Sequence, residues 1–88
     1  MLEIVQSSRF KRDIKKARKQ GKPLAELHTV IKIIVQQKPL PIKFQDHNLG
    51  GDYANFRECH IRPDWLLIYK ITERELQLAR IGSHSELF

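Results

Sequence analysis

The chain has 88 residues, and a chain this short buries only about 60–65% of its unfolded surface, so it can build one small core. The formal net charge of +6 favours a polyanionic partner, either nucleic acid or an acidic protein segment, although it also aids solubility. No apolar run reaches the ~20 residues of a membrane-spanning helix, and the first residues lack the order of a signal peptide. Cys59 is the only cysteine, which excludes an internal disulfide and a paired-cysteine metal site. We therefore expect one cytoplasmic domain over residues 1–88.

The first half of the chain predicts a short strand followed by two helices. Residues 2–5 favour a strand, and Ser7 or Ser8 can cap the helix that follows. Gly21 can end this helix, whose apolar residues recur at helical spacing: Phe10, Ile14 and Ala17. Pro23 can begin a second helix, which Lys38-Pro39 stops. Its apolar set is Leu24, Leu27, Ile31, Ile34 and Val35.

The first helix is unusually basic. It carries seven of the sixteen lysines and arginines: Arg9, Lys11, Arg12, Lys15, Lys16, Arg18 and Lys19. Such a helix is usually a solvated face, but this density also favours contacts with phosphates or with an acidic partner.

Residues 37–51 show neither helical nor alternating periodicity. A structureless connection of this length is uncommon in a small domain unless it has a task, so we expect a functional loop. Three β-rich runs follow, over residues 52–61, 64–71 and 75–81, with a turn at residues 72–74. In the central run one face is apolar and should be covered by the helices: Trp65, Leu67, Tyr69 and Ile71. The predicted order is β-α-α-β-β-β, an α+β fold with two helices packed on a mainly antiparallel sheet.

Three of the four histidines lie outside the predicted helices, at the edges of elements. They are His47 in the long loop, His60 at the end of a strand and His84 beyond the last strand. RNA cleavage without a metal needs a base for the 2′-hydroxyl, an acid for the leaving 5′-oxygen and cations for the phosphorane, and histidine and arginine suit these roles. Arg80 and Asp64 are placed to face the same rim of the sheet.

Each candidate also has a purely structural interpretation. Asp64 can cap the Arg62-Pro63 turn, and Arg80 can pair with Glu58 across the sheet. Trp65 and Tyr69 alternate with other apolar residues, which favours the core over base stacking, whereas Phe88 is a better stacking candidate. The fourth histidine, His28, lies beside apolar helix positions and is interpreted as structural.

A zinc site built from three histidines and one carboxylate competes with acid–base chemistry. Its ligands would be His47, His60, His84 and Asp64. None of their spacings matches the tight pairs that position metal ligands, so we expect neither a metal nor another cofactor.

Three motifs in fixed order resemble the YafQ branch of the RelE/ParE superfamily of bacterial toxins. They are DHNLGG, RECHIRPD and RIGSHSELF. The resemblance is close over residues 38–88, whereas the helical half agrees in layout more than in sequence. It implies a RelE-like fold and a metal-independent endoribonuclease that cuts messenger RNA in the ribosomal A site. It also implies a cognate antitoxin as partner and contact with 16S ribosomal RNA.

The resemblance also assigns functional positions. The catalytic set falls on His47, His60, Asp64, Arg80 and His84. His84 is expected to act as acid or base and His47 or His60 to make the complementary transfer, while Asp64 orients a histidine and Arg80 stabilises phosphate charge. RNA contacts are expected at Trp65, Phe88 and Lys43, and Glu58 matches an acidic position without an assigned role.

Two other functions remain open from the sequence. Relatives of the ParE branch inhibit DNA gyrase without catalysis, but they generally lack this histidine set. A non-catalytic RNA-binding regulator is the third possibility. Growth arrest that disappears in a His84→Ala variant would separate both from a ribonuclease.

Overall fold

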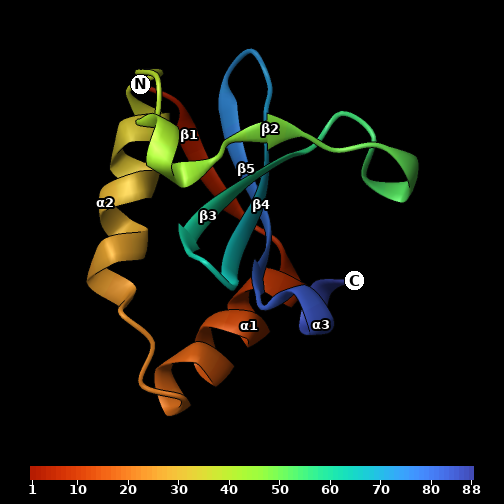
Figure 1. The fold of residues 1–88 in the computed structure, drawn as a ribbon. Coiled ribbons are helices and arrows are strands. Elements are labelled where there is room, and N and C mark those ends of the chain that lie inside the picture. The colour runs from red at the N-terminus through yellow and green to blue at the C-terminus, as the bar shows by residue number, and fades with distance from the viewer.

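A computed structural model of the protein describes residues 1–88, in which helices pack on a central sheet (Figure 1). The elements in chain order are β1 (Glu3–Gln6), α1 (Ser8–Lys19), α2 (Leu24–Val35), the 3-10 helix η1 (Ile42–Phe44), β2 (His47–Asn48), the 3-10 helix η2 (Gly51–Tyr53), β3 (Arg57–Arg62), β4 (Trp65–Ile71), β5 (Glu75–Gly82) and α3 (His84–Leu87). None of the helices is long and apolar enough to cross a bilayer.

The sheet has the strand order β1-β5-β4-β3-β2. β1 runs parallel to β5, and the other neighbours are antiparallel, so the sheet is mixed. The predicted β-α-α-β-β-β order is confirmed, with four short elements that the sequence did not predict: η1, β2, η2 and α3. The segment interpreted as a structureless loop contains η1 and the two-residue strand β2, and the chain ends in the short helix α3. Two strand residues have no periodicity that a sequence pattern can reveal.

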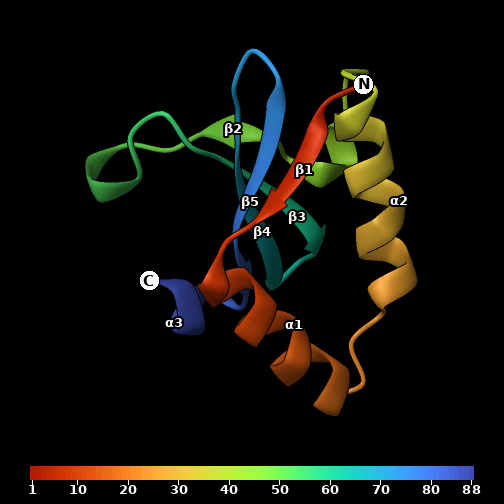
Figure 2. The same ribbon diagram turned by 180° about the vertical axis from the view of Figure 1, so that it is seen from behind.

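Helix α1 begins where the sequence predicts. The Ser7 hydroxyl accepts a hydrogen bond from the Phe10 N–H (2.9 Å) and donates one to the Ala79 carbonyl of β5 (2.8 Å). The cap therefore starts the helix and also fixes it to β5, the strand beside β1. α1 ends at Lys19, and Gly21 follows with φ +70°, a conformation that glycine adopts without strain. Figure 2 shows α1 and α2 from behind, on either side of the loop at residues 20–23.

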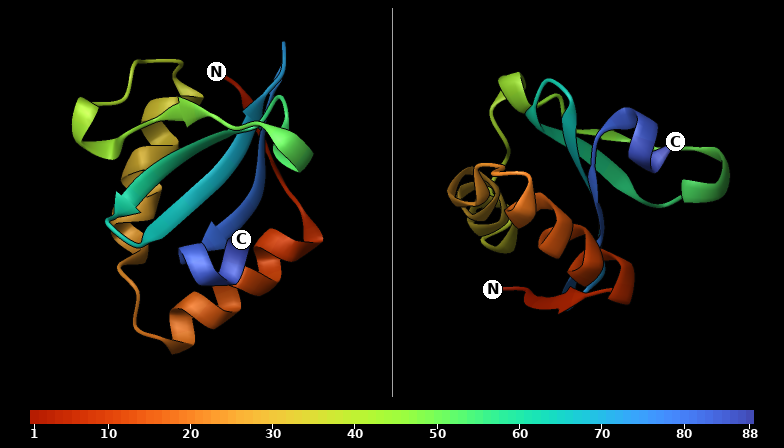
Figure 3. Two further views of the ribbon diagram at one scale, coloured as in Figure 1. Left: turned by 45° about the vertical axis from the view of Figure 1, so that its right-hand side comes forward. Right: turned by 90° about the horizontal axis from the view of Figure 1, so that it is seen from below.

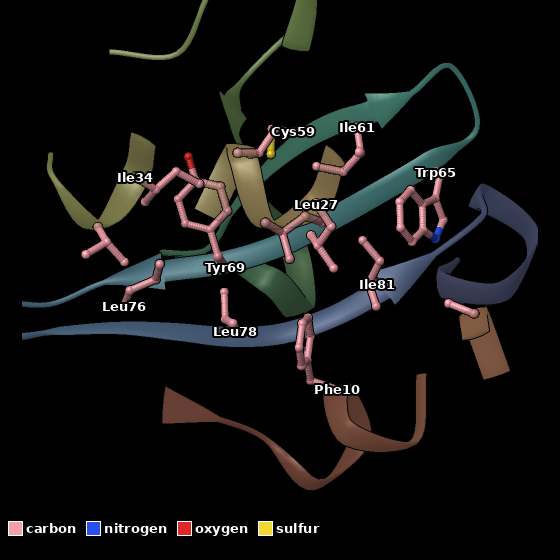
Figure 4. Packing of buried hydrophobic residues seen from close by; sticks show 14 of the residues in the cluster. Phe10, Leu27, Ile34, Cys59, Ile61, Trp65, Tyr69, Leu76, Leu78 and Ile81 are labelled. Carbon is pink, nitrogen blue, oxygen red and sulfur yellow. The ribbon is translucent and has the colours of Figure 1, made fainter. Parts of the chain in front are cut away.

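The main hydrophobic core lies between the two long helices and one face of the sheet (Figure 4). Trp65, Leu67 and Tyr69 of β4 are buried there against residues such as Phe10 and Leu27, as the alternation in β4 predicts. Ile71, expected on the same covered face, is exposed because it ends the strand at the β4–β5 turn.

The opposite face of the sheet has a smaller core. Leu66 and Ile68 of β4 are buried there beneath Leu87 of α3, with Leu49 and Phe56 packed at the margin. Viewed from below, α1 and α2 lie on one side of the sheet and α3 on the other (Figure 3, right). Because α3 covers only part of this face, the polar side chains beside it stay accessible. The candidate site lies on this face.

Candidate active site

Two histidines and a glutamate gather on the outer strands. Side chains alternate along β3, so Glu58 and His60 point away from the main core, in which Cys59 and Ile61 are buried. His47 in β2 lies opposite Glu58 in the antiparallel register. One carboxylate oxygen, Oε1 of Glu58, lies 3.5 Å from His47 Nε2 and 3.4 Å from His60 Nε2. Glu58 is only 4% exposed, which makes it the one buried charged residue of the protein.

His84 completes the cluster from the other end of the chain. Its ring centroid lies 5.8 Å from that of His60, and the His47 and His60 rings are 6.2 Å apart. Asp64, in the turn before β4, accepts hydrogen bonds through Oδ1 from the backbone N–H of His84 (3.0 Å) and from its ring Nδ1 (2.9 Å). These bonds hold the pKa of Asp64 below its usual value. Asp64 therefore contacts His84 and does not serve only the Arg62-Pro63 turn.

The short helix α3 fixes where His84 lies. The Ser83 hydroxyl accepts from the Glu86 N–H, and Glu86 Oε1 accepts from the Ser83 N–H at 2.8 Å, which forms a capping box. Gly82 leaves room for this turn, because a Cβ there would lie 3.2 Å from Glu86 Oε1. Leu87 anchors the helix against Leu66 and Ile68.

The other edge of the site depends on Asp46. Its carboxylate accepts hydrogen bonds from Arg57 (Nη2–Oδ2 2.7 Å) and from the Tyr69 hydroxyl (2.5 Å). Burial and the neighbouring Asp46 raise the pKa of Tyr69. Next to Asp46, the Gln45 carbonyl accepts from His47 Nδ1 at 2.7 Å. A strand of two residues cannot hold itself at the edge of a sheet, so these side-chain bonds hold β2 and with it His47.

Arg80 does not pair with Glu58, which was the structural interpretation of its position. Its Nε and Nη2 instead donate to Asp13 of α1 at 2.8 and 3.1 Å, and the hydrogen bond with Asp13 is the largest cause of its raised pKa. The Ile81 N–H also donates to Asp13. Arg80 lies in register with Ile68 on the open face, and Tyr53 is a further neighbour. The two bonds occupy two of the five guanidinium N–H donors and leave the others for a ligand.

The three expected RNA contacts differ in accessibility. Trp65 is only 2% exposed and packs in the main core. The RNA contact expected for Trp65 from the sequence does not fit this position, because the covered ring offers no free face to a base. Phe88 is 64% exposed, and its ring centroid lies 6.5 Å from that of His84 and 5.7 Å from that of Tyr53. Lys43 is exposed on η1 and lines a groove that also reaches His60.

The three histidines predicted to share a site do lie together. The sequence did not predict that Glu58 lies among them. The structure brings His47, His60 and His84 together, with Asp64 on one histidine and Glu58 between the other two, while His28 lies exposed on α2. Glu58 stands two residues before His60 in a strand, so the alternation rule could have placed both side chains on one face.

A metal ion is chemically possible at part of this cluster. Glu58, His60 and His84 each offer one ligand atom, and these atoms lie within 4.8 Å of one another. The set differs from the one weighed from the sequence, because Glu58 takes the place of Asp64 and His47. Two imidazoles and a carboxylate suit zinc or copper by donor type.

Comparison with known proteins identifies the family. A family model described as "bacterial toxin of type II toxin-antitoxin system, YafQ" matches residues 2–88. The "mRNA interferase toxin YafQ" of Escherichia coli K12 is 36% identical over 87 residues, which cover 98% of this chain and 95% of that protein.

Solved structures agree with this result. The E. coli DinJ–YafQ complex contains a chain that superposes with a TM-score of 0.92 at 35% identity, covering 100% of this chain and 99% of that one. A metal-bound toxin from Helicobacter pylori superposes with a TM-score of 0.94 at 46% identity and full coverage of both chains.

The α+β fold is that of a RelE-like toxin, as the motifs predict. Within that class, the chain belongs to the YafQ family of toxins of bacterial type II toxin–antitoxin systems.

Proposed function

We propose that this chain is an mRNA interferase that cuts messenger RNA in the ribosomal A site by acid–base catalysis in the cytoplasm, and that a cognate antitoxin holds it inactive. The observation that carries the proposal is the convergence of three histidines, each with a polar partner, on the one open face of the sheet. The curated E. coli relatives are named mRNA interferases, which supports the same reaction here.

The reaction needs two proton transfers at opposite sides of a phosphate. A base takes the 2′-hydroxyl proton, the 2′-oxygen attacks phosphorus, the bond to the 5′-oxygen breaks, and an acid protonates that oxygen. The products are a 2′,3′-cyclic phosphate and a 5′-hydroxyl. His84 suits one transfer, because Asp64 engages Nδ1 and leaves Nε2 for the substrate. His47 or His60 then makes the other, and each lies against the carboxylate of Glu58.

Charge on the phosphorane requires fixed cations. Arg80 lies beside Tyr53 on the open face with free N–H donors, and Asp13 holds its guanidinium in place. A guanidinium that a carboxylate already holds in place loses little conformational entropy when it binds a phosphate. Phe88, exposed beside His84, is placed to stack on a neighbouring base.

Metal independence is part of the proposal and has its own test. A metal at the cluster would be held by Glu58, His60 and His84 and would place positive charge beside the phosphate. It would also occupy nitrogens that we assign to proton transfer. Cleavage should therefore persist in EDTA, and added Zn²⁺ should inhibit it. Activity that EDTA abolishes and Zn²⁺ restores would reject metal independence.

The charge of α1 supports both expected partners. Its seven basic residues give the helix a cationic surface that suits ribosomal RNA phosphates or an acidic antitoxin segment. A solved E. coli DinJ–YafQ toxin–antitoxin complex shows that this relative binds an antitoxin. Binding to ribosomes should weaken steeply as salt rises, because released counterions drive such contacts.

The decisive experiment maps RNA 5′ ends in cells that express wild type, His84→Ala or His28→Ala. Wild type and His28→Ala should cut transcripts and arrest growth, because His28 lies exposed on α2, whereas His84→Ala should do neither. All three proteins should bind the antitoxin. Undiminished cutting by His84→Ala would overturn the assignment, and efficient cutting of free RNA without ribosomes would overturn ribosome dependence.

A further inference from the structure

A groove of about 470 Å³ borders the catalytic cluster at the outer edge of β3. It arises because β2 pairs only with Arg57 and Glu58, so the rest of β3 has no strand on its outer side. η1 and α2 frame this space instead, and its volume lies within the range of about 300–1,000 Å³ that is usual for small-ligand sites.

Two residues join the groove to the catalytic cluster. His60 lines the groove, and its Nε2 also lies against Glu58. Gln45 lines it as well, and its carbonyl accepts from His47 Nδ1. A phosphate bound at these histidines would therefore place the nucleoside attached to it at the mouth of the groove.

The walls of the groove suit a nucleobase. Lys43 and Arg62 supply positive charge, Glu26 supplies a carboxylate acceptor, and the half-buried Phe44 ring forms an apolar wall. Arg62 Nε donates to Glu26 Oε2 at 2.7 Å, which fixes a donor and an acceptor side by side. Groups held at fixed positions can read a base edge, because an arginine can donate to the acceptors of guanine and a carboxylate can accept from the amino group of cytosine.

We propose that this groove is a base-binding subsite for the nucleotide next to the scissile phosphate, and that Glu26 and Arg62 determine which base the toxin accepts there. The inference rests on the proposed ribonuclease function and adds the place where sequence is read. Both residues lie on the surface, outside both hydrophobic clusters, so they act on substrate choice and not on the fold.

The test compares Glu26→Gln and Arg62→Ala with charge-matched controls in the distant β4–β5 turn, Glu73→Gln and Arg74→Ala. In each strain the cleaved 5′ ends are mapped, and the frequency of each base on both sides of the cut is divided by its frequency in the transcripts. Wild type and both controls should show the same base preference at one adjoining position. Glu26→Gln and Arg62→Ala should reduce that preference by about 5- to 10-fold, as expected for the loss of one base-edge contact.

The other outcomes are distinct. An unchanged preference in both groove variants, or no preference in wild type, overturns the subsite. A groove variant that cuts like wild type but binds the antitoxin less tightly also overturns it and assigns the groove to the antitoxin. Wild type and His84→Ala test the proposed function separately. If wild type does not cut, the ribonuclease function fails, and if His84→Ala still cuts, the catalytic role of His84 fails. The subsite fails only through the base preference.

Discussion

Lys16 Nζ of α1 lies 2.5 Å from Glu86 Oε2 of α3. The other oxygen of the same carboxylate accepts from the Ser83 N–H and closes the capping box. Glu86 thus ties the helix that begins with His84 to the basic helix on which we expect the antitoxin or ribosomal RNA to bind. A partner that draws Lys16 away would loosen the helix that holds His84, the proposed catalytic histidine.

Breaking this link should lower activity more than stability. Glu86→Gln keeps a side chain that can cap but removes the charge, and we expect a loss of about 0.5–1 kcal/mol of stability, because the pair is near the surface. Cleavage should fall by several-fold at saturating substrate, since His84 becomes less well placed. Thermal unfolding and single-turnover cleavage measure the two effects, and Lys16→Met should reproduce them. Unchanged turnover in both variants would show that α3 is held without the pair.

Glu86 also predicts how stability depends on acid. Its hydrogen bonds, first with Lys16 and then with Ser83, lower its pKa from 4.5 to about 2. A lowered pKa means that the contribution of Glu86 is fully present above pH 4.5 and is lost as the pH falls from 4.5 towards 2. Urea unfolding at pH 6, 4 and 3 should therefore show a smaller acid-dependent loss in Glu86→Gln than in wild type. Equal losses in the two proteins would exclude this group as a cause.

Trp65 should act through the core and not through RNA. Trp65→Ala removes a large buried side chain and should cost about 3–5 kcal/mol, a large part of the total stability of about 5–15 kcal/mol that is usual for a folded protein. Trp65→Phe keeps an aromatic ring and should fold and cleave at close to the wild-type rate. Calorimetry and cleavage assays on both variants distinguish the roles. A well-folded Trp65→Phe protein that binds RNA much more weakly than wild type would support the RNA contact predicted from the sequence.

Asp13 should matter for both the fold and the phosphate site. Asp13→Ala would leave the Ile81 N–H and the Arg80 guanidinium without their partner, at a cost of about 2–4 kcal/mol. Asp13→Asn can still accept from Ile81, so it should cost less while it frees Arg80. Denaturant unfolding and cleavage assays on both variants separate the hydrogen bond that the Ile81 N–H donates from the ion pair with Arg80. Equal stability of the two variants would contradict this division.

Cys59 should be inert in the folded protein. Its side chain is fully buried, and burial raises the pKa of the thiol to about 12, so the reactive thiolate is nearly absent at pH 8. A thiol reagent should label the native protein slowly and the urea-unfolded protein within its ordinary reaction time. Fast labelling of the native state at pH 8 would show that this part of β3 opens readily.

Regular patterns in the sequence predicted most of the fold. The helical spacing of Phe10 and Ala17, the Ser7 cap and the alternation along β4 each appear in the structure as predicted, because burial of apolar residues imposes these periods. The strand at His47 was missed, since two residues show no period. Its place depends on Asp46, Arg57 and on pairing with β3.

The candidate site was predicted only in part, for a related reason. Histidine chemistry and the three motifs pointed to side chains that the structure brings together, but partners distant in sequence are not visible in a linear pattern. Asp13 lies 67 residues before Arg80, and nothing in either neighbourhood indicates their ion pair. Glu58 is close to His60 and could have been placed on its face, yet its position between two histidines depends on the β2–β3 register.

The pairing of the first strand with the last has a consequence for how the protein folds. Glu3 of β1 lies opposite Glu75 of β5, so the sheet closes only after a loop of about seventy residues has been ordered. Contacts this distant in sequence slow folding relative to that of a helical hairpin. Each of the helices α1 and α2 is built from local hydrogen bonds, whereas His84 reaches His60 only after β5 has joined the sheet. The proposed catalytic cluster is therefore completed late in folding, when β5 brings His84 beside His60.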